Sequence, residues 1–362
     1  MIGLLTITEA ALYVCFAILI GGLFLYSIPE RIRPAYTLPA HLLTGSSLLI
    51  ALLSFVPLIP IVTFIAEQSG QSFSLFRFIL TSDMGIQWLT LCLAAVLLAV
   101  FIQLIDVKAS KEAAITGFVW SLLLSVLIAW TSHASSVDAI GGLIAHWIHF
   151  AGVCLWFGIL LVVSWFSVST GEIRWSAFLN WYSPLAIGCM TAITAAGLML
   201  MEYITPAYWD SWLLPYGQAL LLKHLLYAVL ISLAFINGFL LRKSMHIKWL
   251  RAETTIVVVI LLVTAFMTHS ASPRDVTQVL QTDGVSQWFA LLHQGSWSIN
   301  WRVDLAFNSY TILLSFIAML FAALMVMAYR KKHSPFVFTT IGGLAVITVF
   351  IAVLISIVPA AV

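Results

Sequence analysis

Long apolar runs, each close to twenty residues, recur along this chain and are separated by short polar segments. Because they lack the alternation of apolar and polar positions that marks a β-strand, they predict α-helices. A run of about 20 apolar residues is long enough to cross the hydrocarbon core of a bilayer. The pattern predicts about ten spans, at 8–28, 41–66, 86–105, 113–132, 141–168, 177–202, 216–241, 252–269, 306–329 and 335–358. The expected fold class is therefore all-α, a polytopic helical membrane protein.

Composition agrees with this pattern, since 62% of the residues are hydrophobic and only 8% are charged. Soluble domains carry roughly 25% charged residues. The basic residues are scattered as topological markers and form no basic patch, so nucleic-acid binding is not expected. The partners expected at this stage are membrane lipid and a small ligand held within the spans.

Basic residues in the loops give an orientation. Of the 16 Lys and Arg residues, all but Arg77, Lys223, Arg274 and Arg302 fall in one set of loops. These are Arg31, Arg33, Lys108, Lys111, Arg174, Arg242, Lys243, Lys248, Arg251, Arg330, Lys331 and Lys332. The positive-inside rule places these loops in the cytoplasm and both termini outside. No basic residue precedes the first span, so we expect this span to remain as an anchor.

Two span ends, "AWTSHASS" and "AFMTHSAS", predict an internal repeat. Their histidines, His133 and His269, are 136 residues apart (269 − 133), and this shift also aligns Gly22 with Gly158. It lays the first four spans over the next four, which gives a parallel repeat of the kind found in transporters. The expected organisation is an eight-helix core at 1–269 in a 4+4 repeat (1–133 and 134–269), an outer loop with an interfacial aromatic segment at 270–305, and two additional spans within 306–362.

Two histidines lie in the opening turns of the span "LIAHWIHFAGVCLWFGILLVV". Ionisable side chains within a bilayer are costly and are by default a functional hypothesis. His146 and His149 are three residues apart, so their imidazoles share one helical face. With His133 and His269 expected at the same outer membrane level, the four histidines predict a metal site. Each histidine taken alone is better explained by a hydrogen bond to a carbonyl or a helix cap.

Methionines make copper the favoured metal. Met190 and Met199 lie in the span at 177–202, and thioether together with imidazole favours Cu(I) over Mg²⁺ or Ca²⁺. Taken singly, each methionine is more simply a filler of a helical core.

Three further residues are predicted to support the site. Glu202 lies one turn from Met199, and Trp156 continues the stripe of His149. Lys223 lies two turns into its span. It either pairs with Glu202 or Asp138 or extends its charged end to the membrane surface.

Two other functions use the same residues. Histidine also ligates haem, so the alternative is haem b in a membrane oxidoreductase. A third hypothesis is a structural or assembly subunit whose histidines only form hydrogen bonds. The chain has no GxxxxGK[ST], CxxC or Cys-Pro-Cys motif, which excludes a P-type pump. The four cysteines all lie in spans and predict no disulfide.

Three motifs resemble the copper resistance D (CopD) family of polytopic membrane proteins. They are "HFAGVCLWFG", "YGQALLLKHLLYAVLISLAFIN" and "SHA" at 132–134, and the similarity covers roughly the fourth to the eighth span. The resemblance implies a copper-handling protein of the cytoplasmic membrane of a bacterium, active in import or in resistance. It implicates His133, His149, Trp156, Gly158, Lys223 and Asn237.

Three positions depart from the family pattern. His146 stands where the family commonly has an acid, Ser132 replaces its glycine, and His224 replaces an apolar residue. Some relatives carry a soluble copper-binding domain at the N-terminus. Since none precedes the first span here, we expect a separate extracytoplasmic copper donor.

The function predicted from all these residues is copper transport, in the direction of uptake, through an outer histidine site. No enzymatic activity is expected unless the haem alternative holds.

Overall fold

The computed structural model of the protein describes residues 2–69, 74–168, 175–241, 247–293, 297–298 and 301–360. Three of the basic residues that gave the orientation, Arg174, Arg242 and Lys243, lie outside these ranges. So do five residues of the predicted outer loop, 294–296 and 299–300.

Ten helices within the described residues are long and apolar enough to cross a membrane, which confirms the predicted fold class. They are Ile2–Ser27, Ala40–Gln68, Asp83–Leu104, Lys111–Trp130, Gly141–Phe166, Trp175–Ile204, Pro215–Leu240, Ile247–Thr268, Ser309–Arg330 and Pro335–Ser356. The largest difference from the sequence prediction is at the first span, which begins at Ile2. The second span is interrupted by a short 3₁₀ turn, η2 (Val56–Leu58), because Pro57 and Pro60 cannot donate helical hydrogen bonds.

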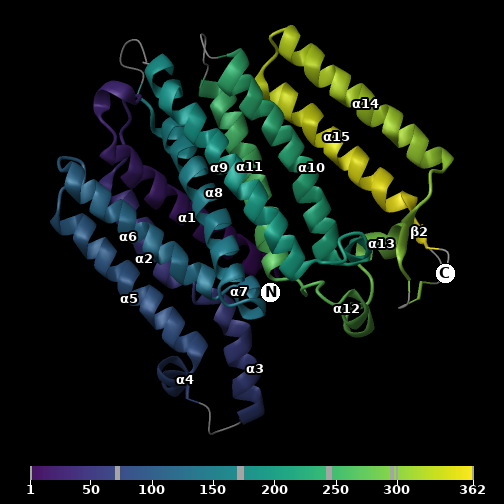
Figure 1. The fold of residues 1–362 in the computed structure, drawn as a ribbon, viewed down its shortest axis with the longest axis horizontal. Helices are drawn as coiled ribbons and strands as arrows, with labels where there is room; N and C mark the ends of the chain where they lie inside the picture. The colour runs from purple at the N-terminus through teal and green to yellow at the C-terminus, as the bar shows by residue number, and fades with distance from the viewer. Residues whose placement is uncertain are drawn as a thin grey trace. The chain divides into compact units, whose positions relative to one another are not determined.

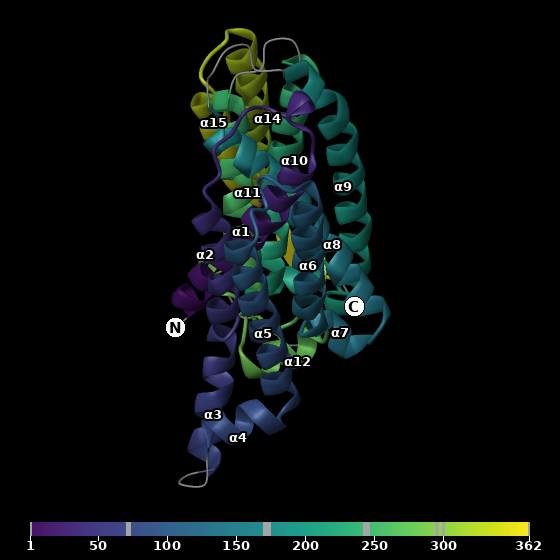
Figure 2. The same cartoon turned by 90° about the vertical axis from the view of Figure 1, so that its left-hand side faces the viewer.

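The chain forms two compact units, and the boundary between them falls within α9 (Trp175–Ile204), after Leu200. The helices of the first unit are α1 (Ile2–Ser27), η1 (Glu30–Ile32), α2 (Ala40–Leu53), η2, α3 (Ile59–Ser69), α4 (Leu75–Thr81), α5 (Asp83–Leu104), α6 (Lys111–Trp130), α7 (His133–Val137), α8 (Gly141–Phe166) and most of α9. Figure 1 and Figure 2 show α3 and α4 extending beyond the end of α6. The predicted 4+4 repeat stays a prediction.

Glycines bring α1 and α8 into their closest contact. A Cβ atom on Gly158 would lie 2.0 Å from the carbonyl oxygen of Ala17, and one on Gly21 would lie 2.2 Å from the carbonyl carbon of Gly158. Small residues let membrane helices approach until their backbones touch, which is the main source of packing energy between helices in lipid. Ala17 and Gly21 are four residues apart, as are Cys154 and Gly158, so each helix presents a pair of small residues.

The rest of the first unit packs around this pair. Helix α1 also contacts α2 and α6, and α5 lies along both α2 and α6. Side chains tie α2 to α5: the hydroxyl of Ser47 donates to the carbonyl of Ala95 at 2.7 Å, and the indole of Trp88 donates to the carbonyl of Ala51 at 3.2 Å. In lipid such polar groups must find partners within the protein.

The second unit is built on two helical hairpins. Its elements are the end of α9, η4 (Asp210–Leu213), α10 (Pro215–Phe235), the π-helical turn η5 (Ile236–Leu240), α11 (Ile247–Thr268), α12 (Val276–Thr282), α13 (Gln287–Leu292), β1 (Val303–Leu305), α14 (Ser309–Arg330), α15 (Pro335–Ser356) and β2 (Ile357–Pro359). Helices α14 and α15 pack side by side in both views, and α15 also packs against α10 and α11. The short strands pair antiparallel, with Val303 opposite Pro359.

Short surface helices occupy the predicted interfacial segments. Ser74 caps α4 by accepting a hydrogen bond from the amide of Arg77. In the outer loop, Trp288 is 63% exposed, as expected of an anchoring indole, whereas Trp301 packs against Phe289 with ring centroids 6.2 Å apart. The loop therefore combines an exposed aromatic residue with a small core of its own.

The α1–α8 contact gives a test of the fold. We expect Gly158→Ala to destabilise the protein by about 1–3 kcal/mol, because the added methyl would displace the carbonyl of Ala17. The thermal unfolding temperature of the detergent-purified protein measures this effect. Gly188→Ala is the matched control, since nothing lies within 4 Å of a Cβ atom at Gly188. Equal melting temperatures for the two variants would show that α1 and α8 do not touch at Gly158.

Candidate metal centre

A hydrogen bond fixes the imidazole of His149. This side chain lies on α8 and is half-buried, and its Nδ1 is 2.9 Å from the carbonyl oxygen of Ile193 on α9. A carbonyl oxygen can only accept, so Nδ1 carries the proton. The neutral ring then has its lone pair on Nε2. Ligand histidines characteristically donate their second ring nitrogen to a carbonyl or carboxylate in this way.

Gly197 leaves room for this ring. A Cβ atom at Gly197 would lie 3.3 Å from both Cε1 and Nδ1 of His149, tighter than most real Cβ contacts. On α8, Gly152 lies one turn after His149 and faces Ile193, so small residues on both helices surround the imidazole. The hydrogen bond and this close packing hold the ring in one orientation.

His146 lies one turn nearer the start of α8, beside an aromatic cluster shared with α1. Its ring meets Phe150 edge-on at a centroid distance of 6.4 Å, and Phe150 in turn meets Tyr13 at 5.7 Å. The pairs Tyr13–Phe150 and Gly21–Gly158 have the same separation in the sequence, 137 residues (150 − 13 and 158 − 21). Helices α1 and α8 therefore run parallel in a constant register.

The same register places Glu9 level with His146, since 146 − 9 is also 137. Glu9 is only 8% exposed and is hydrogen-bonded to Tyr13. The packing of α1 against α8 buries this carboxyl group. The structure thus places a carboxylate on the partner helix at the depth of the first histidine.

The remaining predicted ligands of the first unit lie in different surroundings. His133 is exposed and is the first residue of α7, which Ser132 caps. Met190 lies about 20° round α9 from Gly197, on the face that meets His149. Met199 lies about 200° from Gly197 and is 47% exposed. Of the two methionines, Met190 therefore shares a helical face with the neighbours of His149.

His269, Lys223 and Glu202 belong to the second unit. His269 and Lys223 are half-buried, and Glu202 is exposed. Among the described residues, the ion pairs are Arg33–Glu30 and Arg302–Asp210, and neither includes Lys223 or Glu202. Within the same residues, no three His, Cys, Asp or Glu side chains lie close enough together to hold a metal ion. The four-histidine site stays a prediction.

Two residues implicated by the family resemblance have structural explanations. Trp156 is 3% exposed, and its carbonyl accepts a hydrogen bond from the hydroxyl of Tyr182 on α9 at 3.3 Å. Gly158 is the contact point with α1. Both residues therefore act on the packing of α8, which carries His146 and His149.

Asn237 has a partner that the sequence did not suggest. It lies in η5, is 3% exposed, and its Nδ2 donates to Oε2 of Glu253 on α11 at 2.6 Å. Glu253 is also 3% exposed. In the sequence, Glu253 stands at the second residue of the predicted span 252–269, and no spacing links it to Asn237.

Other histidines of the second unit are held by their neighbours. Nδ1 of His224 is 2.9 Å from the hydroxyl of Tyr208. Burial raises the pKa of Tyr208 above its usual value, so the phenol keeps its proton, and the tautomer of His224 decides which of the two groups donates. His293 lies 2.8 Å from the carbonyl of Leu354 through Nε2 and stacks on Phe289. These contacts explain both side chains without a metal ion.

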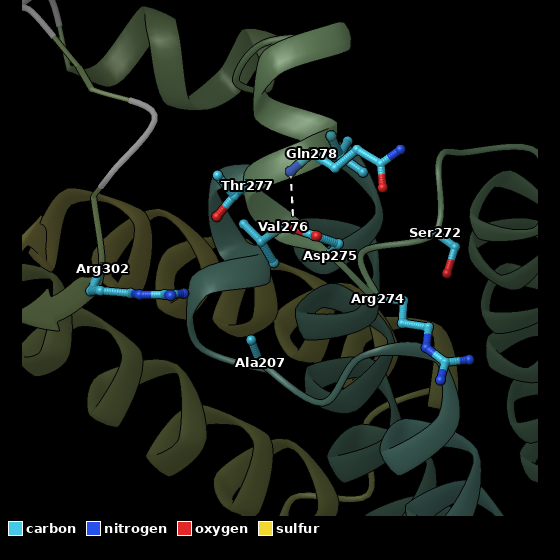
Figure 3. Close-up of a pocket in the computed structure, with 9 residues that line it drawn as sticks. Ala207, Ser272, Arg274, Asp275, Val276, Thr277, Gln278 and Arg302 are labelled. Atoms are coloured by element: carbon cyan, nitrogen blue, oxygen red, sulfur yellow. Dashed lines mark hydrogen bonds between the residues drawn. The ribbon is translucent and has the colours of Figure 1, made fainter.

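An open polar cleft of about 620 Å³ lies in the second unit, between η4 and α12. Figure 3 shows Arg274 and Arg302 on opposite sides of it, and Asp275 bonded to the backbone of Gln278. Arg302 is paired with Asp210 at 3.0 Å. None of the predicted metal ligands lines this cleft, so it is separate from the histidine pair.

Comparison with known proteins bears on the helices just described. Residues 176–267 match the family described as copper resistance protein D (CopD). Copper transport protein CutJ of Bacillus subtilis (strain 168) is 27% identical over 167 residues, which cover 44% of this chain and 30% of the relative. The chain thus matches less than a third of that protein's length. Comparison with the solved structures found no match. The resemblance predicted from the sequence is confirmed, because the stretch from α9 to α11 matches the model of the copper resistance D family.

Proposed function

We propose that this protein transports copper across the cytoplasmic membrane of a bacterium, in the direction of uptake. The observation that carries the proposal is the orientation of His149, whose Nδ1 donates to the carbonyl of Ile193 as the second ring nitrogen of a ligand histidine characteristically does. His146 lies one turn away on the same face. In this proposal, the two imidazoles receive the ion at the outer end of α8.

The chemistry of the surrounding side chains supports copper as the cargo. Imidazole suits copper and zinc, and a nearby thioether favours Cu(I). Met190 supplies that thioether on the α9 face next to Ile193, deeper in the membrane if both termini are outside. Glu9, at the level of His146, adds a carboxylate that attracts a cation. His133, His269 and Met199 are the further ligands predicted from the sequence.

The proposal extends to the surroundings of the transporter. The ion reaches the outer face from a separate extracytoplasmic donor protein, and the spans lie in membrane lipid with both termini outside. The relative named for copper transport and the family named for copper resistance support copper as the cargo. No catalysed reaction is part of it.

Elemental analysis with an optical spectrum tests the histidine pair. We expect about one or two copper ions per chain in the detergent-purified protein, and the loss of this copper in a His146→Ala/His149→Ala double variant. Copper should be lost because the double variant removes both imidazoles on α8, and no other described side chains near α8 supply two imidazoles. Unchanged copper content in the double variant contradicts the site. A Soret band that the double variant lacks would assign the histidines to haem b instead.

Gly197 provides a subtler test, because it touches His149 without being a ligand. We expect Gly197→Val to lower copper affinity by about 10–100-fold, since the side chain would push the imidazole off the carbonyl of Ile193. Titration with a competing Cu(I) chelator measures the affinity. Gly188→Val on the same helix is the control, because nothing lies within 4 Å of its Cβ position. Equal affinities for the two variants would show that the His149–Ile193 hydrogen bond does not orient a ligand.

A further inference from the structure

A buried polar pair lies inside the membrane-spanning part of the second unit. Glu253 lies six residues after the start of α11, roughly 9 Å along the helix axis. Its carboxylate accepts a hydrogen bond from Asn237 at 2.6 Å, and both residues are 3% exposed. Carboxylates within a membrane span are rare, and they mark ion or proton pathways.

The amide of Asn237 can take only one orientation. Its Nδ2 also donates to the backbone carbonyl of Trp249, at 3.3 Å. Because a carbonyl only accepts, the amide nitrogen must face Trp249, and Oδ1 must point to the other side. Among the described residues, this buried oxygen has no hydrogen-bond donor. A buried acceptor without a donor is costly, so Oδ1 is suited to accept from a water molecule beside the carboxylate.

The backbone at Asn237 is widened. Residues 236–240 form the π-helical turn η5, closed by a hydrogen bond of 2.8 Å from the amide of Leu241 to the carbonyl of Ile236. Such turns occur mostly as single bulges in α-helices, frequently at functional sites. The bulge follows directly on α10, the helix that carries Lys223.

No cation lies in ion-pair contact with Glu253 among the described residues. Lys248 and Arg251, on α11 itself, are exposed and lie about 140° and 160° round the helix from Glu253. The two helices packed against α11 are α10 and α15. The ionisable residue of α10 that lies nearest to Asn237 in the sequence is Tyr227, and α15 has no ionisable residue. Helix α14 contributes Tyr329, which meets the ring of Trp249 rather than Glu253.

We propose that Glu253 and Asn237 form an intramembrane proton-binding site, and that its proton is coupled to copper movement. The carboxylate takes one proton from water and becomes a neutral carboxylic acid; release of that proton restores the charge. A neutral amide as the bonding partner permits both states, whereas an arginine or lysine partner would hold the charged form. The coupling rests on the proposed transport function, but proton binding does not.

Infrared spectroscopy of the full chain in liposomes tests proton binding without any copper. In a Glu9→Gln background, which removes the other buried carboxyl group of the described spans, we expect a carboxylic-acid C=O band that disappears when the buffer is made alkaline, and that is missing once E253Q is added. The control is Glu67→Gln, which removes an exposed carboxylate of α3 and leaves the band unchanged. Asn237→Ser is a second variant that keeps the carboxyl group, and it should shift the band. A band that persists in the Glu9→Gln/E253Q double variant overturns the proposal.

Copper-driven proton flux tests the coupling. Proteoliposomes that enclose a pH-sensitive dye are given Cu(I), and internal copper and internal pH are followed together. We expect E253Q to bind as much copper as the wild type and to show only the proton flux of protein-free vesicles. Wild-type proton flux in E253Q would overturn the coupling while transport stands. If the wild type moves no copper, the proposed function fails, and the infrared band still decides whether Glu253 binds a proton.

Discussion

The contact between Gly21 and Gly158 is the constraint on which the first unit depends. Lipid offers no hydrophobic gain for bringing two apolar helices together, so their association relies on close van der Waals packing and polar contacts. At this point the two backbones touch, with no space for a Cβ atom on either side. One such contact sets the register of α1 against α8. That register then decides the depth of Tyr13, Phe150, Glu9 and His146 relative to one another.

Helix α9 is attached to this pair in a different manner. It meets α8 through the His149–Ile193 hydrogen bond, the hydroxyl of Tyr182 on the carbonyl of Trp156, and the glycines at 152 and 197. Much of its remaining surface is exposed. The imidazole of His149 therefore joins the two helices, and the ligand role proposed for it would fall to its other ring nitrogen.

The spans were predictable because apolar length is a property of the sequence alone. The structure reproduces all ten, and only the interruption at Pro57 and Pro60 and the early start of α1 were not anticipated. The family motif drew attention to Gly158 and Asn237, but their partners, Gly21 and Glu253, come from helices that meet only in the folded chain. Spacing alone separates Met190 from Met199 by about 180° on a helical wheel. Which of the two faces His149 depends on the side of α9 that meets α8. The burial of Glu9 could not be predicted from the sequence, because it depends on which face of α1 packs against α8.

The α1–α8 contact also bears on how the protein is made. Gly158 is synthesised 137 residues after Gly21 (158 − 21), which at cellular rates of roughly 5–20 residues per second is a delay of about 7–27 seconds. During that interval, the first helix is in the bilayer without its principal partner, and its glycine surface and the carboxyl group of Glu9 face lipid or the insertion machinery. Correct assembly therefore requires α1 to remain near the site of insertion until α8 arrives, although α1 is synthesised well before it.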